Sequence, residues 1–307
     1  MSKLSESHQV VLPRRRLRRL ASRIVGLAPP IKPSETSQHP IRVVCISDTH
    51  NSQPDLPPGD LLLHAGDLTE WGSFAEIQAQ LSWLSAQPHT HKLIIAGNHD
   101  VLFDSAFLES EKERFPVKDG QTRADLDFGS VTYLQDEAKA LQFPALGRSC
   151  TIYGSPWTPK YVKSAFQYSR EDDIWSEKIP NDVDIVLTHG PPHGHLDGSR
   201  RSGCHYLAKA ITERRPSLVV FGHIHVGHGK EIVRFDSLRN IYEDVERDWS
   251  GWEMIPIMIM LLLWARQSTA VTKILSIRRP ERLTQLINAA IVGEGNRPCN
   301  EAMVVNI

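Results

Sequence analysis

Two histidines one residue apart, His223 and His225, follow the apolar run LVVF and a glycine. In an extended chain, residues two apart point to the same side, so both imidazoles should face one side at the end of a buried strand. Asp48 and His50 repeat this spacing after another apolar run. Imidazole and carboxylate groups together suit divalent metal ions such as Mn, Fe and Zn. The alternative for His223 and His225 is a pair of core histidines bonded to backbone carbonyls.

Further apolar runs between residues 41 and 225 end in side chains of the same kinds. Carboxylates, imidazoles and one amide follow them, at Asp67, Asn98, His99, Asp100 and His189. Burying such groups together is costly unless something pairs them. The carboxyl ends of strands in an α/β sheet gather where the chemistry takes place. A lone Asp-x-His motif is weak evidence, but five such strand ends in order indicate one metal site.

The elements that must position these residues are short. Seven strands are predicted over residues 41–50, 60–67, 92–100, 131–136, 150–157, 183–190 and 217–225, and two more over 286–292 and 302–307. Near-continuous Val, Ile and Leu runs are typical of strands covered on both faces. Helical spacing predicts helices over 73–86, where Ser73 and Glu76 can form a capping box, and over 206–215. Strands alternating with helices predict a layered α/β fold.

The motifs DTH, GD, GNHD, THG and GHIH, in this order, resemble those of the calcineurin-like metallophosphoesterases. The stretches LLLHAGDLTEWGS and VFGHIHVGHG are similar to the metallophosphoesterase domain-containing subfamily of animals and fungi. The resemblance implies an α/β fold of four layers, αββα, in which two packed sheets are flanked by helices. It also implies a dinuclear metal site at the carboxyl ends of the strands.

The resemblance further implies two divalent metal ions, from among Mn, Fe, Zn and Mg. The implied ligands are Asp48, His50 and His225 for one metal, Asn98, His189 and His223 for the other, and Asp67 as the bridge. Two metals about 3.5–4 Å apart clamp both sides of an in-line displacement at phosphorus. A metal-bridging hydroxide is then the expected nucleophile, because two cations stabilise it near neutral pH.

His99 matches the catalytic histidine of the family and follows Asn98, so it should lie at the site without binding metal. A protonated imidazole there is a good general acid for the leaving alkoxide. Asp100 either orients or charges His99, or caps the helix expected after it. Asn98 should also hold the phosphoryl oxygens, and His193, in the loop after His189, either lines the substrate pocket or is exposed.

The expected activity is hydrolysis of small phosphodiesters such as (cyclic) nucleotides, and the diester preference rests on the resemblance alone. The alternative is a phosphomonoesterase or protein phosphatase. The stretch GDLTEW lacks the arginine of the GDxVDRG motif that phosphoprotein phosphatases use, which argues against this alternative. A metal-bound scaffold without catalysis is a third reading, disfavoured by the complete ligand set.

The composition of the chain limits the kinds of partner that can be expected. The chain of 307 residues is 40% hydrophobic and 23% charged, as in ordinary soluble globular proteins. Its net charge of −1 indicates no nucleic-acid surface. The four cysteines form no CxxC pair, which is typical of thiols in a reducing compartment, so we expect a cytoplasmic location. The expected partner is a small-molecule phosphoester, and the sequence indicates no oligomeric state.

Two segments lie outside the motifs. Residues 1–40 form a basic, proline-bearing tail that we expect to be disordered, with a membrane-surface amphipathic helix and a targeting signal as alternatives. Residues 41–307 form the metallophosphoesterase domain, with an apolar helical insertion at 236–283. We expect this helix to pack on the domain, while a peripheral membrane or subunit contact through 236–283 or the tail stays open. No apolar run reaches the roughly 20 residues that span a bilayer.

Overall fold

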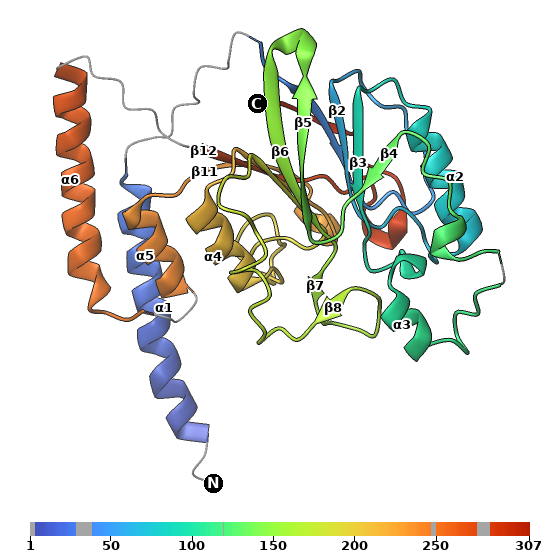
Figure 1. The fold of residues 1–307 in the computed structure, drawn as a ribbon. Helices are drawn as coiled ribbons and strands as arrows, with labels where there is room; N and C mark the ends of the chain where they lie inside the picture. The colour runs from blue at the N-terminus through green and yellow to red at the C-terminus, as the bar shows by residue number, and fades with distance from the viewer. Residues whose placement is uncertain (1–3, 29–38, 119, 247–249, 275–282) are drawn as a thin grey trace. The chain divides into compact units, whose positions relative to one another are not determined.

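The computed structural model describes residues 4–28, 39–118, 120–246, 250–274 and 283–307 (Figure 1). The chain divides into two compact units. The larger comprises Glu35–Ile232 and Thr284–Ile307, and the smaller comprises Met1–Ser34 and Val233–Leu283. The larger unit contains every predicted site residue.

The first sheet of the larger unit has five strands in the order β13-β1-β2-β3-β4. These are β1 (Arg42–Ile46), β2 (Leu61–Ala65), β3 (His91–Ile95), β4 (Val131–Tyr133) and β13 (Met303–Asn306). Strands β1 to β4 are parallel, and β13 pairs antiparallel with β1. The carboxyl ends of β1, β2 and β3 therefore lie at one edge.

The second sheet has six strands in the order β11-β12-β10-β9-β6-β5. These are β5 (Glu137–Phe143), β6 (Arg148–Ser155), β9 (Ile185–Thr188), β10 (Leu218–Phe221), β11 (Gly229–Arg234) and β12 (Leu283–Asn288). Strands β6, β9, β10 and β12 are parallel, and β5 pairs antiparallel with β6. A small parallel pair joins β7 (Thr158–Pro159) to β8 (Gln167–Tyr168).

All nine predicted strands are confirmed. Strand β5 was not predicted, because Glu137, Lys139 and Gln142 interrupt its apolar pattern and only Leu141 and Phe143 of this strand are buried. Its position depends on pairing with β6 across the hairpin. The α/β fold class expected from the alternating pattern is confirmed.

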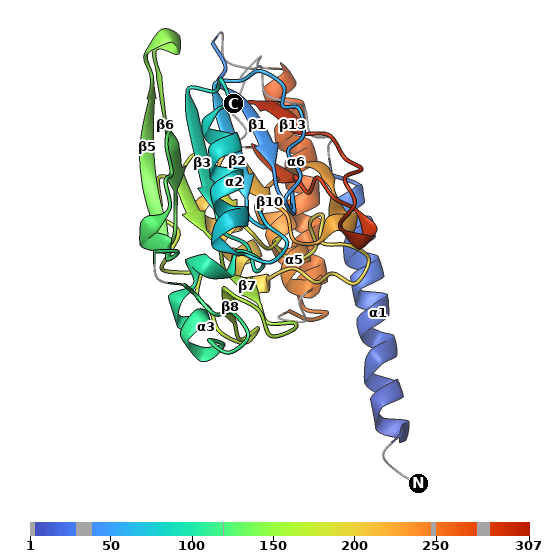
Figure 2. The ribbon, with the colours of Figure 1, turned by 90° about the vertical axis from the view of Figure 1, so that its right-hand side faces the viewer.

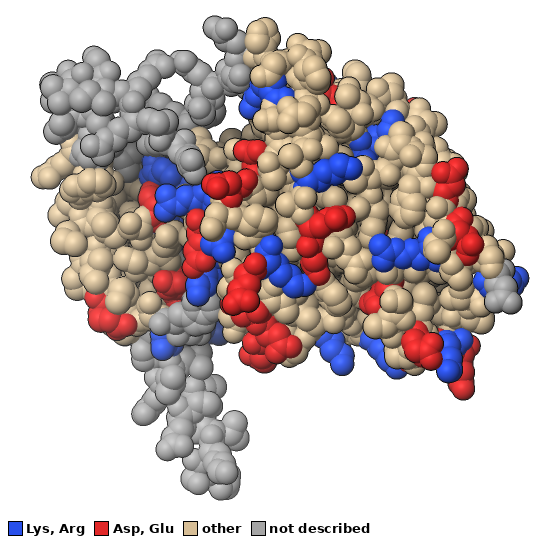
Figure 3. Space-filling view, in the orientation of Figure 1, with Lys and Arg blue, Asp and Glu red and all other residues tan. Residues whose placement is uncertain are grey.

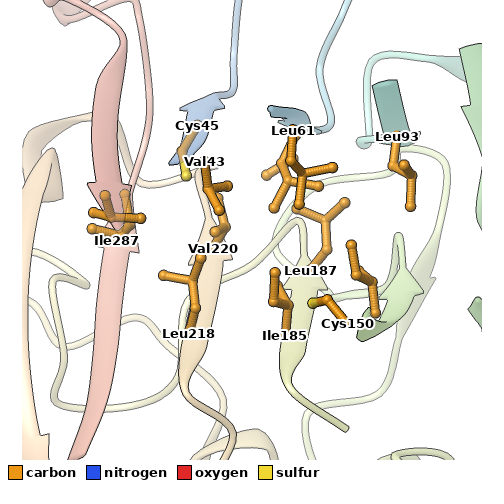
Figure 4. Packing of buried hydrophobic residues seen from close by; sticks show 14 of the residues in the cluster. Val43, Cys45, Leu61, Leu93, Cys150, Ile185, Leu187, Leu218, Val220 and Ile287 are labelled. Atoms are coloured by element: carbon orange, nitrogen blue, oxygen red, sulfur yellow. The ribbon is translucent and has the colours of Figure 1, made fainter. Parts of the chain in front are cut away.

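The two sheets pack face to face. Val43 and Leu61 of the first sheet share a buried apolar cluster with Ile185, Leu218 and other residues of the second (Figure 4). The alternate residues of the first sheet point outward and pack against α2 (Phe74–Ser85), which covers that face (Figure 2). The predicted capping box of Ser73 and Glu76 is present at the start of α2.

The remaining helices of the larger unit are short. They are α3 (Ser105–Ser110), α4 (His205–Arg214), and the 3-10 turns η1 (Val101–Phe103), η2 (Arg123–Asp125), η3 (Pro144–Leu146), η4 (His225–Gly227) and η5 (Glu294–Asn296). The single helix expected after Asp100 is instead η1 followed by α3. Asp104 separates them and caps α3 by accepting a bond from the Phe107 amide. Acidic and basic side chains are interspersed over the face of the larger unit in Figure 3.

The smaller unit contains α1 (Leu4–Gly26), α5 (Ser237–Glu246) and α6 (Met254–Ile274). Residues Leu4–Gly26, for which a disordered arm was expected and an amphipathic helix was an alternative, form helix α1. Leu17, Ala21 and Ile24 are buried in a cluster with residues of α5 and α6. The arm is helical because its apolar stripe finds partners more than 200 residues away in the chain. Residues 1–3, 29–38, 247–249 and 275–282 of the two predicted segments lie outside the described residues.

Candidate metal centre

The predicted ligands converge at the rim of the sandwich, where the carboxyl ends of both sheets meet. The first sheet contributes residues that follow β1, β2 and β3, and the second contributes residues that follow β9 and β10. In chain order they are Asp48, His50, Asp67, Asn98, His99, His189, His223 and His225. The sheets are joined here by direct bonds. The His223 amide donates to the Asp48 carboxylate at 3.0 Å, and His189 Nδ1 lies 2.8 Å from the Ala65 carbonyl.

Four of these residues have left-handed backbone conformations. The φ angles are +52° for Asp48, +41° for His50, +53° for Asp67 and +65° for His223. Such conformations cost non-glycine residues about 1–3 kcal/mol each and persist where the surroundings dictate them, often at functional sites. The strain therefore marks the strand ends that turn their side chains into the centre.

Glycines allow the close approach of two of the loops. A Cβ on Gly222 would lie 1.9 Å from Asp48 Oδ2, and a Cβ on Gly97 would lie 2.2 Å from Asp67 Oδ1. No larger residue fits at either position without moving a carboxylate. The glycines that precede His223 and Asn98 are thus required by packing against the acidic side chains.

One group of ligand atoms is formed by Asp48, His50 and His225, with these atoms all within 4.8 Å of one another. His225 Nε2 lies 3.3 Å from Asp48 Oδ1. The other ring nitrogen of His225 lies 3.3 Å from the Gly293 carbonyl. The three residues implied for one metal are therefore brought together.

A second group is formed by Asp67, His189 and His223. His189 Nε2 lies 3.3 Å from Asp67 Oδ2 and 3.1 Å from Asn98 Oδ1, so the Asn98 amide points into the same group. His50 Nε2 lies 3.9 Å from Asp67 Oδ2 on the other side. Asp67 thus lies between the two groups, the place that a bridging carboxylate needs.

His99 lies beside both groups. Its ring centroid is 4.7 Å from that of His50, and its nitrogen, with His50 and Asp67, makes a third group within ligand reach. Its backbone amide donates to Asp67 Oδ1, and its Nδ1 lies 2.8 Å from the Glu70 carbonyl. A carbonyl only accepts, so Nδ1 carries the proton and Nε2 is the atom available to a ligand. The geometry admits His99 as a metal ligand as well as the acid expected from the sequence.

The electrostatics of the centre follow from burial and from opposite charges. Burial alone would raise the pKa of Asp67, but His189 and neighbouring histidines hold this pKa well below its usual range. Burial alone would lower the pKa of His189, but the Asp67 carboxylate raises it to about 9. Burial and the charge of His189 lower the pKa of His223 to about 4. Metal binding by His189 must therefore displace a proton at neutral pH.

The donor set fits divalent metal ions. Ionised carboxylates and imidazoles suit Mn, Fe and Zn. His50 Nε2 is buried and has no hydrogen-bond partner among the described residues. An orphaned buried nitrogen is costly, and a metal ion held with Asp48 and His225 would satisfy it.

Glu70 and Asn296 belong to the site but were not predicted. The Glu70 carboxylate lies 3.1 Å from His50 Nδ1, and Asn296 Nδ2 donates to this carboxylate at 3.0 Å. The contact with His50 is a close approach of a carboxylate to an imidazole rather than a hydrogen bond, since His50 Nδ1 has no hydrogen-bond partner among the described residues. Carboxylates beside a ligating histidine orient its ring and raise its basicity. The position of Glu70, three residues after Asp67, was an available signal. No signal in the sequence pointed to Asn296, because it lies 226 residues after Glu70 in the chain.

Asp100 has a role beyond the expected charging of His99. Its buried carboxylate accepts bonds from the Gly97, Leu68 and Thr69 amides and from the Thr69 hydroxyl. It makes no side-chain bond to the start of η1, so it is not a cap. No hydrogen bond joins it to His99 among the described residues, although its charge helps to raise the pKa of His99. Asp100 ties the loop of Asp67 to the loop of Asn98, so it positions ligands.

His193 lies in the loop after His189, as expected. Its ring packs on that of His205, with centroids 3.7 Å apart, and its Nδ1 lies 3.8 Å from Asp197 Oδ2. It belongs to none of the three ligand groups found among the described residues. A contact between His193 and substrate therefore stays a prediction.

Comparison with known proteins agrees with the motifs. The family described as calcineurin-like phosphoesterase matches residues 41–227. The chain is 40% identical over 261 residues to "Probable rhamnogalacturonate lyase C" of Emericella nidulans, covering 84% of this chain and 23% of that protein. It is 37% identical over 207 residues to "Metallophosphoesterase domain-containing protein 1" of Homo sapiens, covering 61% of each.

The chain is also 37% identical over 233 residues to "UPF0046 protein T07D4.2" of Caenorhabditis elegans, covering 67% of this chain and 56% of that protein. It spans less than two thirds of the length of each of these relatives. The matched region contains the whole ligand set, from the strand before Asp48 to His225. This chain belongs to the calcineurin-like phosphoesterase family.

Proposed function

We propose that the protein is a metal-dependent hydrolase of small phosphodiesters, with nucleotides, including cyclic ones, as the substrate class. The observation that carries the proposal is the convergence of strand-end side chains into two ligand groups with Asp67 between them. Asp48, His50 and His225 would hold one divalent ion. Asp67, His189 and His223, with Asn98, would hold the second.

Divalent ions bound there would supply Lewis-acid stabilisation of the phosphoryl oxygens and activation of the attacking water. Mn, Fe and Zn suit the mixed nitrogen and oxygen donors better than Mg. The residues of the chain supply the rest. Asp67 stays ionised at neutral pH, because its pKa is held well below the usual range.

His99 is the proposed general acid. Burial alone would lower its pKa, but the charge of Asp67 and the bond to the Glu70 carbonyl raise it above the ordinary value. With Nδ1 held by Glu70, the mobile proton sits on Nε2 at the rim of the centre. His99 can then protonate the leaving alkoxide, a contribution typically worth 10²–10⁴-fold in rate.

The preference for diesters is supported by local charge. Trp71 stands where the GDxVDRG motif has its phosphate-binding arginine. A monoester dianion needs more positive charge around its phosphoryl oxygens than a diester monoanion. Polysaccharide elimination, suggested by the name of the Emericella nidulans relative, is not proposed, because the chain matches only 23% of that protein.

The test uses the full chain, stripped of metal and reconstituted with Mn²⁺. Turnover of bis(p-nitrophenyl) phosphate and of cyclic nucleotides is compared with that of p-nitrophenyl phosphate. We expect faster diester turnover. Monoester-only turnover would replace the diester proposal with the phosphatase alternative, and bound metal without any turnover would favour a scaffold.

A variant tests the acid. His99→Ala should retain folding and lower kcat by about 10²–10⁴-fold. The matched control is His39→Ala, at an exposed histidine outside the candidate metal centre, and this variant should keep the parent rate. Unchanged turnover of His99→Ala with bound metal would remove His99 from the mechanism.

A further inference from the structure

Helix α6 of the smaller unit has two apolar faces, and only one is buried. Ile255, Met258 and Leu262 pack into the core formed with α1 and α5. The opposite face exposes large apolar side chains, at Ile257 (38%), Ile259 (44%), Met260 (62%), Leu263 (56%) and Trp264 (60%). Their three- and four-residue spacing makes them one continuous surface along the helix. We call these five residues the α6 apolar face.

Helix α1 adds positive charge to the same unit. Its buried residues Leu17, Ala21 and Ile24 leave the other side of the helix to solvent, where Arg15, Arg16, Arg19 and Arg23 are exposed. The exposed side of α1 is therefore strongly basic over its described side chains.

Two hydrogen bonds fix how α1 and α6 run beside each other. Arg14 Nη1 donates to the Ser250 carbonyl just before α6, and Arg266 Nη2 donates to the Leu27 carbonyl just after α1. The two helices therefore run in the same direction, and α1, α5 and α6 lie side by side in both ribbon views (Figures 1 and 2). The arginines and the α6 apolar face thus belong to one packed unit.

The α6 apolar face and the α1 arginines together indicate which partner covers the α6 apolar face. Contiguous exposed apolar surface marks a protein or membrane contact. Exposed arginines complement the phosphates of anionic lipids, and a helix with an apolar face accompanied by basic residues is the pattern of proteins that lie in a membrane interface. Exposed Trp252 (47%) and Trp264 add the aromatic side chains that prefer that depth.

No helix among the described residues has the length and hydropathy needed to cross a bilayer. We propose that the three-helix unit docks on an anionic membrane, with the α6 apolar face among the acyl chains and the α1 arginines at the lipid phosphates. This inference is independent of the proposed catalytic activity.

The test is co-sedimentation of the full chain with vesicles of phosphatidylcholine containing 30% phosphatidylserine, against vesicles of phosphatidylcholine alone. We expect partitioning to the anionic vesicles that weakens at high salt. The variant Met260→Glu/Leu263→Glu should bind at least about tenfold more weakly, since membrane affinity scales with buried apolar area. Val162→Glu, at a residue of the larger unit that is 60% exposed, is the matched control and should bind like the parent.

The charge is tested separately. Arg19→Gln and Arg23→Gln should each weaken binding about fivefold, the factor for one basic residue at an anionic surface. Lys112→Gln, an equal charge change at an exposed lysine of the larger unit, should not. A measurement without variants is tryptophan quenching by brominated phosphatidylcholine in the anionic vesicles, which should be observed if Trp264 enters the bilayer.

Three results would overturn the proposal. The first is no partitioning to anionic vesicles and no quenching. The second is partitioning that the α6 and α1 variants leave unchanged. The third is a dimer in sedimentation that Met260→Glu/Leu263→Glu dissolves without any effect of lipid, which would assign the face to a second copy of the chain.

Discussion

Replacing Gly222 by alanine perturbs the candidate metal centre without replacing a ligand. Gly222 connects β10 to His223, and its φ lies outside the left-handed region, so alanine can adopt the same backbone conformation. The added methyl group would lie 1.9 Å from Asp48 Oδ2 and 2.1 Å from Ser47 Oγ. The effect of the substitution therefore comes from contact alone.

The size of the displacement follows from the geometry. Real Cβ contacts essentially never fall below 3.0 Å, so the methyl group and the Asp48 carboxylate must separate by at least about 1.1 Å. Metal sites tolerate errors of about 0.2 Å in ligand distance. A shift of this size should remove Asp48 from the group with His50 and His225, and weaken metal binding there by at least about 10–100-fold, the loss typical of a disturbed ligand environment.

The assay is calorimetric titration of the metal-stripped protein with Mn²⁺, together with metal content after dialysis. The matched control is Gly190→Ala, which follows ligand His189. Its methyl group would meet Thr158 Cγ2 at 3.2 Å, so small movements accommodate it. We expect parental metal binding in Gly190→Ala and weak binding in folded Gly222→Ala. Parental binding in Gly222→Ala would show that the Asp48 carboxylate is not needed as a ligand.

Three further outcomes are expected. Glu70→Gln should weaken Mn²⁺ binding about 10–100-fold in calorimetry, because its carboxylate lies 3.1 Å from His50 Nδ1; equal affinity would refute its positioning role. His64 is buried and its pKa is lowered to about 3, so the unfolded chain binds one more proton below pH 6.5 and stability falls as pH falls. In urea unfolding, the free energy of unfolding should fall between pH 7 and pH 5.5 in the parent, and this fall should be smaller by about 1.4 kcal/mol in His64→Gln. An equal fall in both proteins would contradict the lowered pKa of His64. Leu81→Ala, at a fully buried residue of α2, should cost about 2–5 kcal/mol in urea unfolding, whereas exposed Ser82→Ala should change stability little; similar effects would contradict the packing of α2 on the first sheet.

Local pattern was sufficient for most of the larger unit. The predicted strands are runs whose own side chains demand burial on both faces, and the α2 capping box lies within four residues of sequence. Strand β5 was not predicted because its polar residues do not form a buried apolar run. Its conformation depends instead on pairing with β6. The helix at Leu4–Gly26 was only an alternative to a disordered arm for a related reason, since its burial depends on α5 and α6.

The roles around the ligands show the same division. Asp100 was read from its neighbours in sequence, but its bonds go to the loop of Leu68 and Thr69, about 30 residues away. Glu70 faces His50 and Asn296, and only the packing of the loops brings them together. Hydrogen-bond partners of a buried carboxylate depend on which backbone amides lie near it, and sequence spacing does not state this.

The sequence by itself determined the fold class, the strands that carry the site and the types of side chain that end them. These depend on short-range properties, namely hydrophobic runs, helical spacing and the order of the motifs. The family resemblance implied which side chains share a group and that Asp67 lies between the two groups, and the tertiary structure shows this arrangement. Only the tertiary structure decided that Asp100 joins the loop of Asp67 to the loop of Asn98. It also decided that the basic N-terminal segment packs with α5 and α6. Each of these depends on contacts between distant parts of the chain, and such contacts exist only after the sheets and helices have packed.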